Sequence, residues 1–242
     1  MSNSLPWVVV LDTESTSWHL GPQSALLALG AVRVNLETGE CVDRFYTPVA
    51  SLLPIPTRIR QLTGITPELL VGAPLPLDAV TAFQQWRKEA ILAGHGLRRD
   101  LLLLDAVSSG IFGLAEQPLL DTAILARDVE PAMAKQGEIA LDTLLAYHRM
   151  QLPPWSTPGG LAADHPQEVR HWSGRWGALR HHALGDALLT AGVLFVLWQK
   201  RKQQKLETHT RVAHLAHLQH PRGGSRFARA KVSSQWGEGQ SR

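Results

Sequence analysis

Acidic residues at three separate points of the sequence have the chemistry of a cation site. Asp12 and Glu14, in the run Asp12-Thr13-Glu14, directly follow the apolar residues 8–11, which predict a buried strand. If that strand continues, the two carboxylates lie on one face, about 6–7 Å apart, because strand side chains alternate with a period of two. They repel each other unless a cation lies between them, and Mg²⁺ prefers such oxygen ligands. The alternative is two solvated acids at the end of a strand.

Two more acids stand at the starts of predicted helices. Asp100 follows a brief apolar strand and opens the helical run 101–104, where an aspartate is also a common N-cap. Asp186 enters an apolar helix, where an unpaired buried charge is costly. His181 lies before Asp186 by five positions, about 140° away on an ideal helix. His181 can therefore share a site with Asp186 only if it precedes the helix.

Four converging carboxylates and one histidine have a specific chemical use. Four such groups can hold two divalent metal ions, which together activate a water molecule and stabilise the leaving oxygen of a phosphodiester. Their combination indicates nucleic-acid hydrolysis more strongly than any one motif does.

The elements that must position these groups follow from the hydrophobic pattern. Strands are predicted over residues 8–11, 26–34, 41–49, 91–94 and 119–121, and helices over 80–91, 100–108, 122–129, 141–148 and 183–202. Prolines predict a long connection after the third strand, with a turn at 64–67 before a short helical segment. Three consecutive strands followed by alternating helices and strands predict an α/β fold, with a mixed sheet and helices on its faces.

Charge divides the chain into two parts. Residues 1–199 hold 14 Lys and Arg against 19 Asp and Glu, a net of −5, whereas residues 200–242 hold ten against two, a net of +8. Hydrophobic periodicity also fades from about residue 205, so we predict a domain over 1–204 and a flexible basic tail over 205–242. Such a tail either contacts nucleic acid or another polyanion, or is simply solvated.

The cysteine content and the length of the apolar stretches indicate where in the cell the protein is expected. The single cysteine, Cys41, excludes a disulfide framework and a Cys-rich zinc site. The first residues have no basic leader region, and the uncharged apolar stretch 187–199 is shorter than the ~20 residues that span a bilayer. We therefore expect a cytoplasmic protein without membrane contact.

Six ordered segments resemble the DnaQ-like 3′–5′ exonucleases, in the branch with four acidic residues and a catalytic histidine (DEDDh). This family includes the epsilon proofreading subunit of bacterial DNA polymerase III, RNase T and oligoribonuclease. The resemblance covers about residues 7–198. The matching segments are Asp12–Thr16, Leu62–Leu70, His95–Asp100, Leu120–Arg127, Ala140–Leu145 and His181–Ala187.

The resemblance implies a ribonuclease-H-like fold, with a five-stranded mixed sheet flanked by helices. It implies that Asp12, Glu14, Asp100 and Asp186 hold two Mg²⁺ or Mn²⁺ ions. His181 would then be the general base that takes a proton from the attacking water, and a neutral imidazole suits that role. The product would be a nucleoside 5′-monophosphate released from the 3′ end.

The resemblance also assigns residues around this centre. Asp121 is expected to support the site structurally. Thr13, Thr16, Gly64 and Arg99 are expected to contact the substrate.

The sequence departs from the family pattern at several positions. The family's Asn after the second-motif His is Gly96 here, its Phe before the second Asp is Arg99, and its common His before Gly-Ile-Thr is Thr63. Arg99 could instead contact phosphate. His182 competes with His181, because a Tyr lies four residues before the last Asp in the family's other branch; the spacing favours His181. The loop 151–180, rich in Trp and Arg, either grips a strand end or is a packed excursion.

We expect a metal-dependent 3′–5′ exonuclease acting on single-stranded 3′ ends of DNA or RNA. One alternative is a proofreading subunit that acts with a DNA polymerase. Another is a non-catalytic nucleic-acid-binding protein with a nuclease-like fold, whose signature would be a lost carboxylate. The oligomeric state is not predicted.

Overall fold

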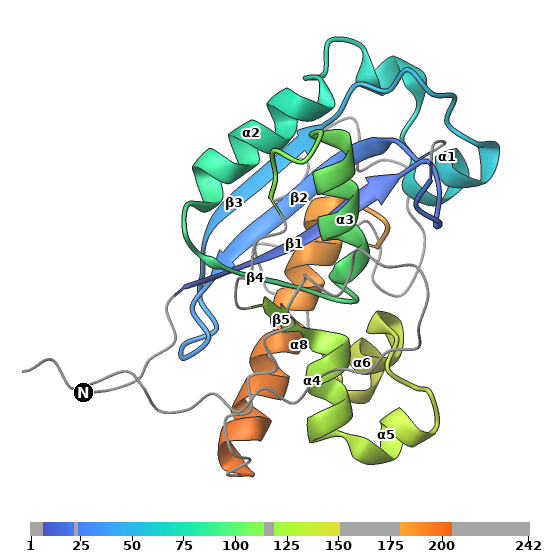
Figure 1. The fold of residues 1–242 in the computed structure, drawn as a ribbon. Helices are drawn as coiled ribbons and strands as arrows, with labels where there is room; N and C mark the ends of the chain where they lie inside the picture. The colour runs from blue at the N-terminus through green and yellow to red at the C-terminus, as the bar shows by residue number, and fades with distance from the viewer. Residues whose placement is uncertain (1–6, 22–23, 114–118, 151–179, 205–242) are drawn as a thin grey trace, which may run out of the picture.

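A computed structural model describes residues 7–21, 24–113, 119–150 and 180–204. Five strands form one mixed sheet in the order β3-β2-β1-β4-β5 (Figure 1). Strands β1, β2 and β3 are antiparallel neighbours, whereas β4 is parallel to both β1 and β5. The predicted five-stranded mixed sheet is therefore confirmed. The strands are β1 (Val8–Ser15), β2 (Leu26–Val34), β3 (Cys41–Pro48), β4 (Ile91–Gly94) and β5 (Leu119–Asp121).

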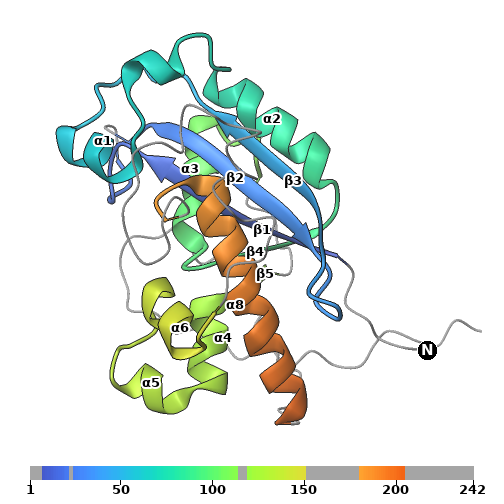
Figure 2. The ribbon, with the colours of Figure 1, turned by 180° about the vertical axis from the view of Figure 1, so that it is seen from behind.

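Helices cover both faces of the sheet. Helices α2 and α3 pack on one face, and α8 crosses the other, with α4, α5 and α6 beside it (Figures 1 and 2). The helical segments are α1 (Thr57–Thr63), the 3₁₀ turn η1 (Pro67–Leu70), α2 (Pro76–Arg87), α3 (Arg98–Val107), α4 (Thr122–Val129), α5 (Pro131–Lys135), α6 (Leu141–Tyr147) and α8 (Ala183–Gln203).

The central strand β1 explains why the sheet is covered on both sides. Val9 and Leu11 pack with the residues of α2 and α3, whereas Val8 and Val10 pack with those of α8. Since successive side chains point to opposite faces, a continuous apolar run requires a helix layer on each side. The end of β1, which carries the acids, therefore lies between two helix layers.

The predicted helix boundaries are wrong in the region after β3. The expected helix over 80–91 starts earlier, at Pro76, because proline fits the first position of a helix. It also ends earlier, at Arg87, because Lys88 has a positive φ of 54°. The proline-rich connection contains the unpredicted helix α1, which ends where Gly64 takes φ = 73°. The short helix α5 was not predicted either.

Helix α8 is long and apolar enough to cross a membrane by length and composition alone. However, 72% of its apolar window is buried inside the fold. The helix packs along β1 and β2 and against α4, which is the environment of a core helix. The predicted loop at 151–178 and the predicted tail at 205–242 lie outside the described residues.

Candidate active site

Strand β1 places the first two acids on one face. The strand runs on through Asp12 and Glu14 to Ser15, so the two carboxylates share a face as the alternation requires. Asp12 pairs with Gly30 of β2, and paired residues of neighbouring strands point to the same side of a sheet. This side is the one that α8 covers.

Gly30 allows the helix α8 to reach the acids. A Cβ atom at Gly30 would lie 2.1 Å from the backbone nitrogen of Leu184, so only glycine lets the first turn of α8 lie on the strand. Asp186 lies two residues after Leu184 in α8, so this close contact also brings Asp186 to β1. Sequence reasoning did not single out Gly30, although a glycine inside a strand often marks a close backbone approach.

Three of the predicted ligands meet at this point. Asp12, Glu14 and Asp186 each offer an oxygen within 4.8 Å of the others. The pKa values of Asp12 and Glu14 lie well above their usual range, first because both side chains are buried and second because the charge of Asp186 is close. Burial also raises the pKa of Asp186. Ionising all three groups together is therefore unfavourable without a nearby cation.

The donor set fits a hard divalent metal ion. All ligand atoms in the cluster are carboxylate oxygens, which suit Mg²⁺ or Mn²⁺. In addition, the buried Oδ1 of Asp186 is paired with a cation, the Arg180 guanidinium. A buried oxygen of this kind is a suitable metal ligand.

Asp100 lies next to this cluster but outside the group of three. It occupies the first turn of α3, where Leu97 takes the N-cap position, so the N-cap alternative for Asp100 is wrong. Its Oδ1 accepts a hydrogen bond of 2.5 Å from the Thr13 hydroxyl, and burial raises its pKa to about 6. Its charge also raises the pKa values of Asp12 and Glu14. Asp100 is thus electrostatically coupled to the site.

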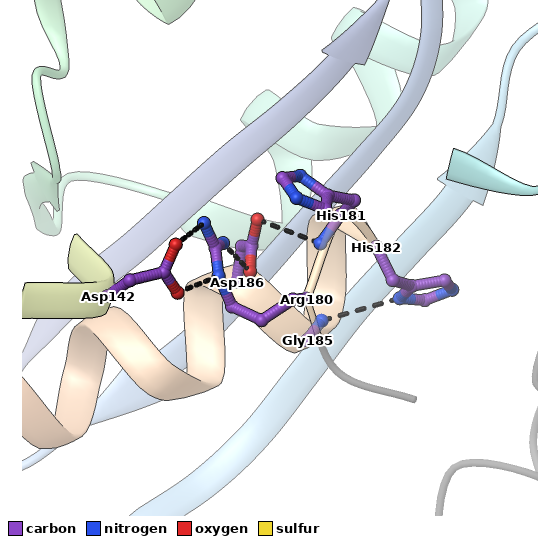
Figure 3. A network of polar contacts seen from close by, with 6 residues as sticks. All are labelled: Asp142, Arg180, His181, His182, Gly185 and Asp186. Carbon is purple, nitrogen blue, oxygen red and sulfur yellow. Dashed lines mark hydrogen bonds and ion pairs between the residues drawn. The ribbon is translucent and has the colours of Figure 1, made fainter. Parts of the chain in front are cut away.

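The two adjacent histidines have different environments. His182 is buried, stacks on Tyr46 with ring centroids 4.6 Å apart, and accepts a hydrogen bond from the Gly185 N–H through Nδ1. His181 has a positive φ of 61°, and its N–H donates to Asp186 Oδ2 at 3.2 Å. The two rings point in different directions (Figure 3). The internal partners of His182 favour His181 as the base, a role that stays a prediction.

Arg180 and Asp142 join the site without having been predicted. The Arg180 guanidinium forms an ion pair with Asp186 Oδ1 and two hydrogen bonds with the Asp142 carboxylate, of 2.7 and 3.3 Å (Figure 3). Its charge lowers the pKa values of Asp12, Glu14 and Asp186 against the larger effect of burial. An arginine in a long loop gave no sequence signal for this contact.

Asp121 connects β5 to the turn before α3. Its carboxylate accepts hydrogen bonds from the backbone N–H groups of Gly96 at 3.0 Å, Leu97 at 2.9 Å and Ala123 at 2.9 Å. The first two belong to the turn that leads into α3 and Asp100. This geometry is suited to structural support.

Comparison with known proteins places this geometry in a family. The model of the RNase T exonuclease family matches residues 9–151, more than half of the chain. The chain belongs to this family. The exonuclease assignment and the DnaQ-like resemblance are therefore confirmed.

Curated relatives of this exonuclease domain include an epsilon subunit of DNA polymerase III and PolC-type DNA polymerases III. The DNA polymerase III subunit epsilon of Aquifex aeolicus is 34% identical over 128 residues, which are 52% of this chain and 62% of that protein. The PolC-type DNA polymerase III of Clostridium perfringens is 26% identical over 196 residues, 81% of this chain but 11% of that protein. The chain thus spans less than two thirds of the length of either.

Solved structures share the fold. The nuclease domain of 3′hExo, a DEDDh family member bound to rAMP, has a TM-score of 0.59 at 17% identity and is covered over 94% of its length, with 82% of this chain aligned. Escherichia coli Exonuclease I, solved with a dT13 oligonucleotide, has a TM-score of 0.60 at 11% identity; 82% of this chain and 42% of that one are aligned. These similarities support the ribonuclease-H-like fold.

The departures from the RNase T exonuclease pattern have structural explanations. Gly96, where the resemblance suggests Asn, has φ = 67°, a conformation that Gly and Asn adopt more readily than other residues. Arg99, in place of Phe, donates to the carbonyl oxygens of Ser17 and Trp18 and to the Ser15 hydroxyl. Arg99 therefore connects the segment after β1 to α3 through Nε and Nη2 of its guanidinium.

The other predicted substrate contacts also have internal partners. The Thr13 hydroxyl is buried and donates to Asp100, and the Thr16 hydroxyl accepts from the Ala25 N–H at 2.8 Å. Gly64 ends α1, next to Ile65, which packs in the same cluster as Ala183 at the start of α8. Substrate binding by these residues stays a prediction.

Proposed function

We propose that this chain is a metal-dependent 3′–5′ exonuclease that hydrolyses the terminal phosphodiester of DNA or RNA and releases nucleoside 5′-monophosphates. The observation that carries the proposal is the convergence of Asp12, Glu14 and Asp186 within 4.8 Å, beside His181. Membership of an exonuclease family agrees with it. The direction is supported by the DnaQ-like resemblance, and the fold is shared with a 3′-exonuclease.

Each residue has a defined part in this reaction. Asp12, Glu14, Asp100 and Asp186 would hold two Mg²⁺ or Mn²⁺ ions. Bound metal supplies activation of the attacking water and stabilisation of the leaving 3′ oxygen. His181 accepts a proton from that water on a ring nitrogen. Burial, and next the charge of Arg180, lower the pKa of His181, so its imidazole is neutral and ready to accept the proton at neutral pH.

The segment after β1 offers a contact for the terminal base. Trp18 is 55% exposed although it follows directly on the strand that carries Asp12 and Glu14. The Arg99 guanidinium lies 6.0 Å from the centre of its ring and holds its backbone in place. An exposed aromatic ring can stack on any base, which suits a substrate without sequence preference.

A degradation assay on labelled oligonucleotides tests the proposal. The substrates carry the label at the 3′ or the 5′ end, are made of DNA or RNA, and are incubated with Mg²⁺, Mn²⁺ or EDTA. We expect mononucleotides to be released first from the 3′ end, only with metal. Release that starts at the 5′ end, or that persists in EDTA or in an Asp186→Asn variant, would contradict the proposed mechanism. Binding without degradation would favour a non-catalytic nucleic-acid-binding protein.

A proofreading role is the second candidate. It is favoured by the 34% identity to a DNA polymerase III subunit epsilon. In that role the chain would remove mispaired 3′ ends while bound to a polymerase. Capture of a purified DNA polymerase III catalytic subunit by the full chain, compared with a variant lacking residues 205–242, tests it. Equal capture would dismiss docking through the tail, and no capture would dismiss the role.

The basic tail and the location are further parts of the proposal. If the net charge of +8 in residues 200–242 binds nucleic acid, affinity should fall steeply with salt concentration and weaken on truncation. Equal binding by the truncated chain across a salt series would reject this. We also propose a cytoplasmic location, because a single cysteine, Cys41, fits a reducing compartment.

A further inference from the structure

Arg180 occupies an unusual place for a cation. It is the residue directly before His181, and its side chain is only 20% exposed. One edge of its guanidinium contacts Asp186, a predicted metal ligand, through Nη1 (Figure 3). Asp142, on the first turn of α6, accepts the hydrogen bonds from Nε and Nη2. One arginine thus bridges the acidic cluster and a separate carboxylate.

The cluster needs this positive charge when it holds no metal. Asp12 and Glu14 are half-buried beside the buried Asp186, whose charge raises the pKa values of both. Arg180 acts in the opposite sense on all three groups. At the short distance of an ion pair, opposite charges attract strongly even at the effective dielectric constant of about 20 that suits protein sites.

The same contact competes with metal binding. Asp186 Oδ1 is paired with the Arg180 guanidinium, and Asp186 also belongs to the carboxylate cluster, so a metal ion and the guanidinium would compete for this carboxylate. Asp142, by contrast, offers Arg180 a second acceptor whose side chain is 61% exposed. The guanidinium can therefore leave Asp186 and keep a charged partner.

We propose that Arg180 is a built-in counter-cation of the carboxylate cluster, which stabilises the metal-free site through Asp186 and is displaced toward Asp142 when metal binds. This inference rests on the proposed metal site. It makes Arg180 a positioning residue that sets metal affinity, and Asp142 the acceptor that makes its displacement possible.

Mn²⁺ binding to purified full-length protein tests the inference. The measurements are the Mn²⁺ dissociation constant, by calorimetry or by the electron paramagnetic resonance of free Mn²⁺, and the melting temperature in EDTA. For Arg180→Met we expect Mn²⁺ affinity to rise about tenfold and the melting temperature in EDTA to fall by about 2–4 °C. For Asp142→Asn we expect Mn²⁺ affinity to fall, because Arg180 then has only Asp186. Arg44→Met, an exposed change on β3 with the same loss of charge, should leave the affinity within about twofold.

The outcomes separate this inference from the proposed function. If Asp186→Asn abolishes Mn²⁺ binding while Arg180→Met leaves it unchanged or weaker, the metal site stands and the counter-cation role is wrong. If neither wild type nor Arg180→Met shows Mn²⁺ binding that depends on Asp186, the metal site fails and the inference fails with it. Should Arg180→Met not fold, Asp142→Asn decides, because unchanged or tighter Mn²⁺ binding in that variant overturns the role.

Discussion

Two groups of carboxylates in this fold have different partners. One is Asp121, which faces hydrogen-bond donors, and the other is the cluster of Asp12, Glu14 and Asp186, whose members face one another. Asp121 accepts hydrogen bonds from three backbone N–H groups. The three clustered acids face one another, and burial with mutual repulsion raises the pKa values of Asp12 and Glu14.

This difference distinguishes a carboxylate that stabilises the fold from carboxylates that are suited to bind metal. A carboxylate with several N–H donors stabilises the fold, because each donor would otherwise be unsatisfied. A group of carboxylates that face one another destabilises the fold unless positive charge, here that of Arg180 or of a bound metal ion, offsets their repulsion. Stability and activity should therefore respond in opposite ways when acids in the two regions are neutralised.

The largest expected effect is on activity in the clustered region. Asp12→Asn or Asp186→Asn should lower exonuclease activity at least about 1,000-fold, equivalent to about 4 kcal/mol, because a metal ligand is lost. In EDTA, Asp12→Asn should melt at or above the wild-type temperature, since repulsion within the cluster is relieved. Glu89→Gln, an exposed change in the loop after α2, is the control and should alter neither quantity. A large fall in melting temperature in EDTA would show that these acids are structural.

A substitution at Gly30 tests the contact between β2 and the first turn of α8, which brings Asp186 to β1. Gly30→Ala would place a methyl group 2.1 Å from the Leu184 nitrogen, so α8 must move away from β2. We expect a loss of about 3 kcal/mol in unfolding free energy, or more, together with loss of activity. Denaturant unfolding measures it. Gly21→Ala is the matched control, because nothing lies within 4 Å of its Cβ position. A stable, active Gly30→Ala protein would contradict the assembly described for the site.

The pH dependence sharpens the comparison at Asp100. Its pKa in the folded protein is about 6, above the ordinary value of 3.8, so the folded state binds the proton more tightly than the unfolded state. The stability contributed by the protonated group is complete below pH 4 and is lost as pH rises toward 6. In EDTA, Asp100→Asn should therefore match wild type near pH 4 and exceed it by up to about 3 kcal/mol above pH 6. Denaturant unfolding across this range checks it, and a difference independent of pH would argue against the raised pKa.

The smallest expected effect concerns Asp121. Asp121→Ala leaves three backbone N–H groups without their acceptor and should lower the unfolding free energy by about 2 kcal/mol. This change is opposite in sign to the effect of neutralising Asp12. Thermal melting in EDTA measures both on the same scale. A destabilisation by Asp12→Asn that equals that by Asp121→Ala would remove the distinction between the two regions.

Local pattern was sufficient for much of the fold. The apolar run at 8–11 predicted the central strand, and the alternation predicted that Asp12 and Glu14 share a face. The boundaries of α2 were missed because hydrophobic periodicity does not show them. The helix begins at a proline, Pro76, and ends where one residue, Lys88, takes a positive φ.

The sequence by itself determined the strands, the longer helices and the acids that stand at their ends, because these depend on neighbours within a few positions. Only the tertiary structure decided which groups meet. Arg99 contacts Ser15, 84 positions away, and Arg180 reaches Asp142 across 38 positions. His182 is distinguished from His181 by Tyr46, and Asp186 reaches Asp12 because Gly30 has no side chain. Such contacts depend on how closely two elements pack, and packing distance leaves no periodic trace in the sequence.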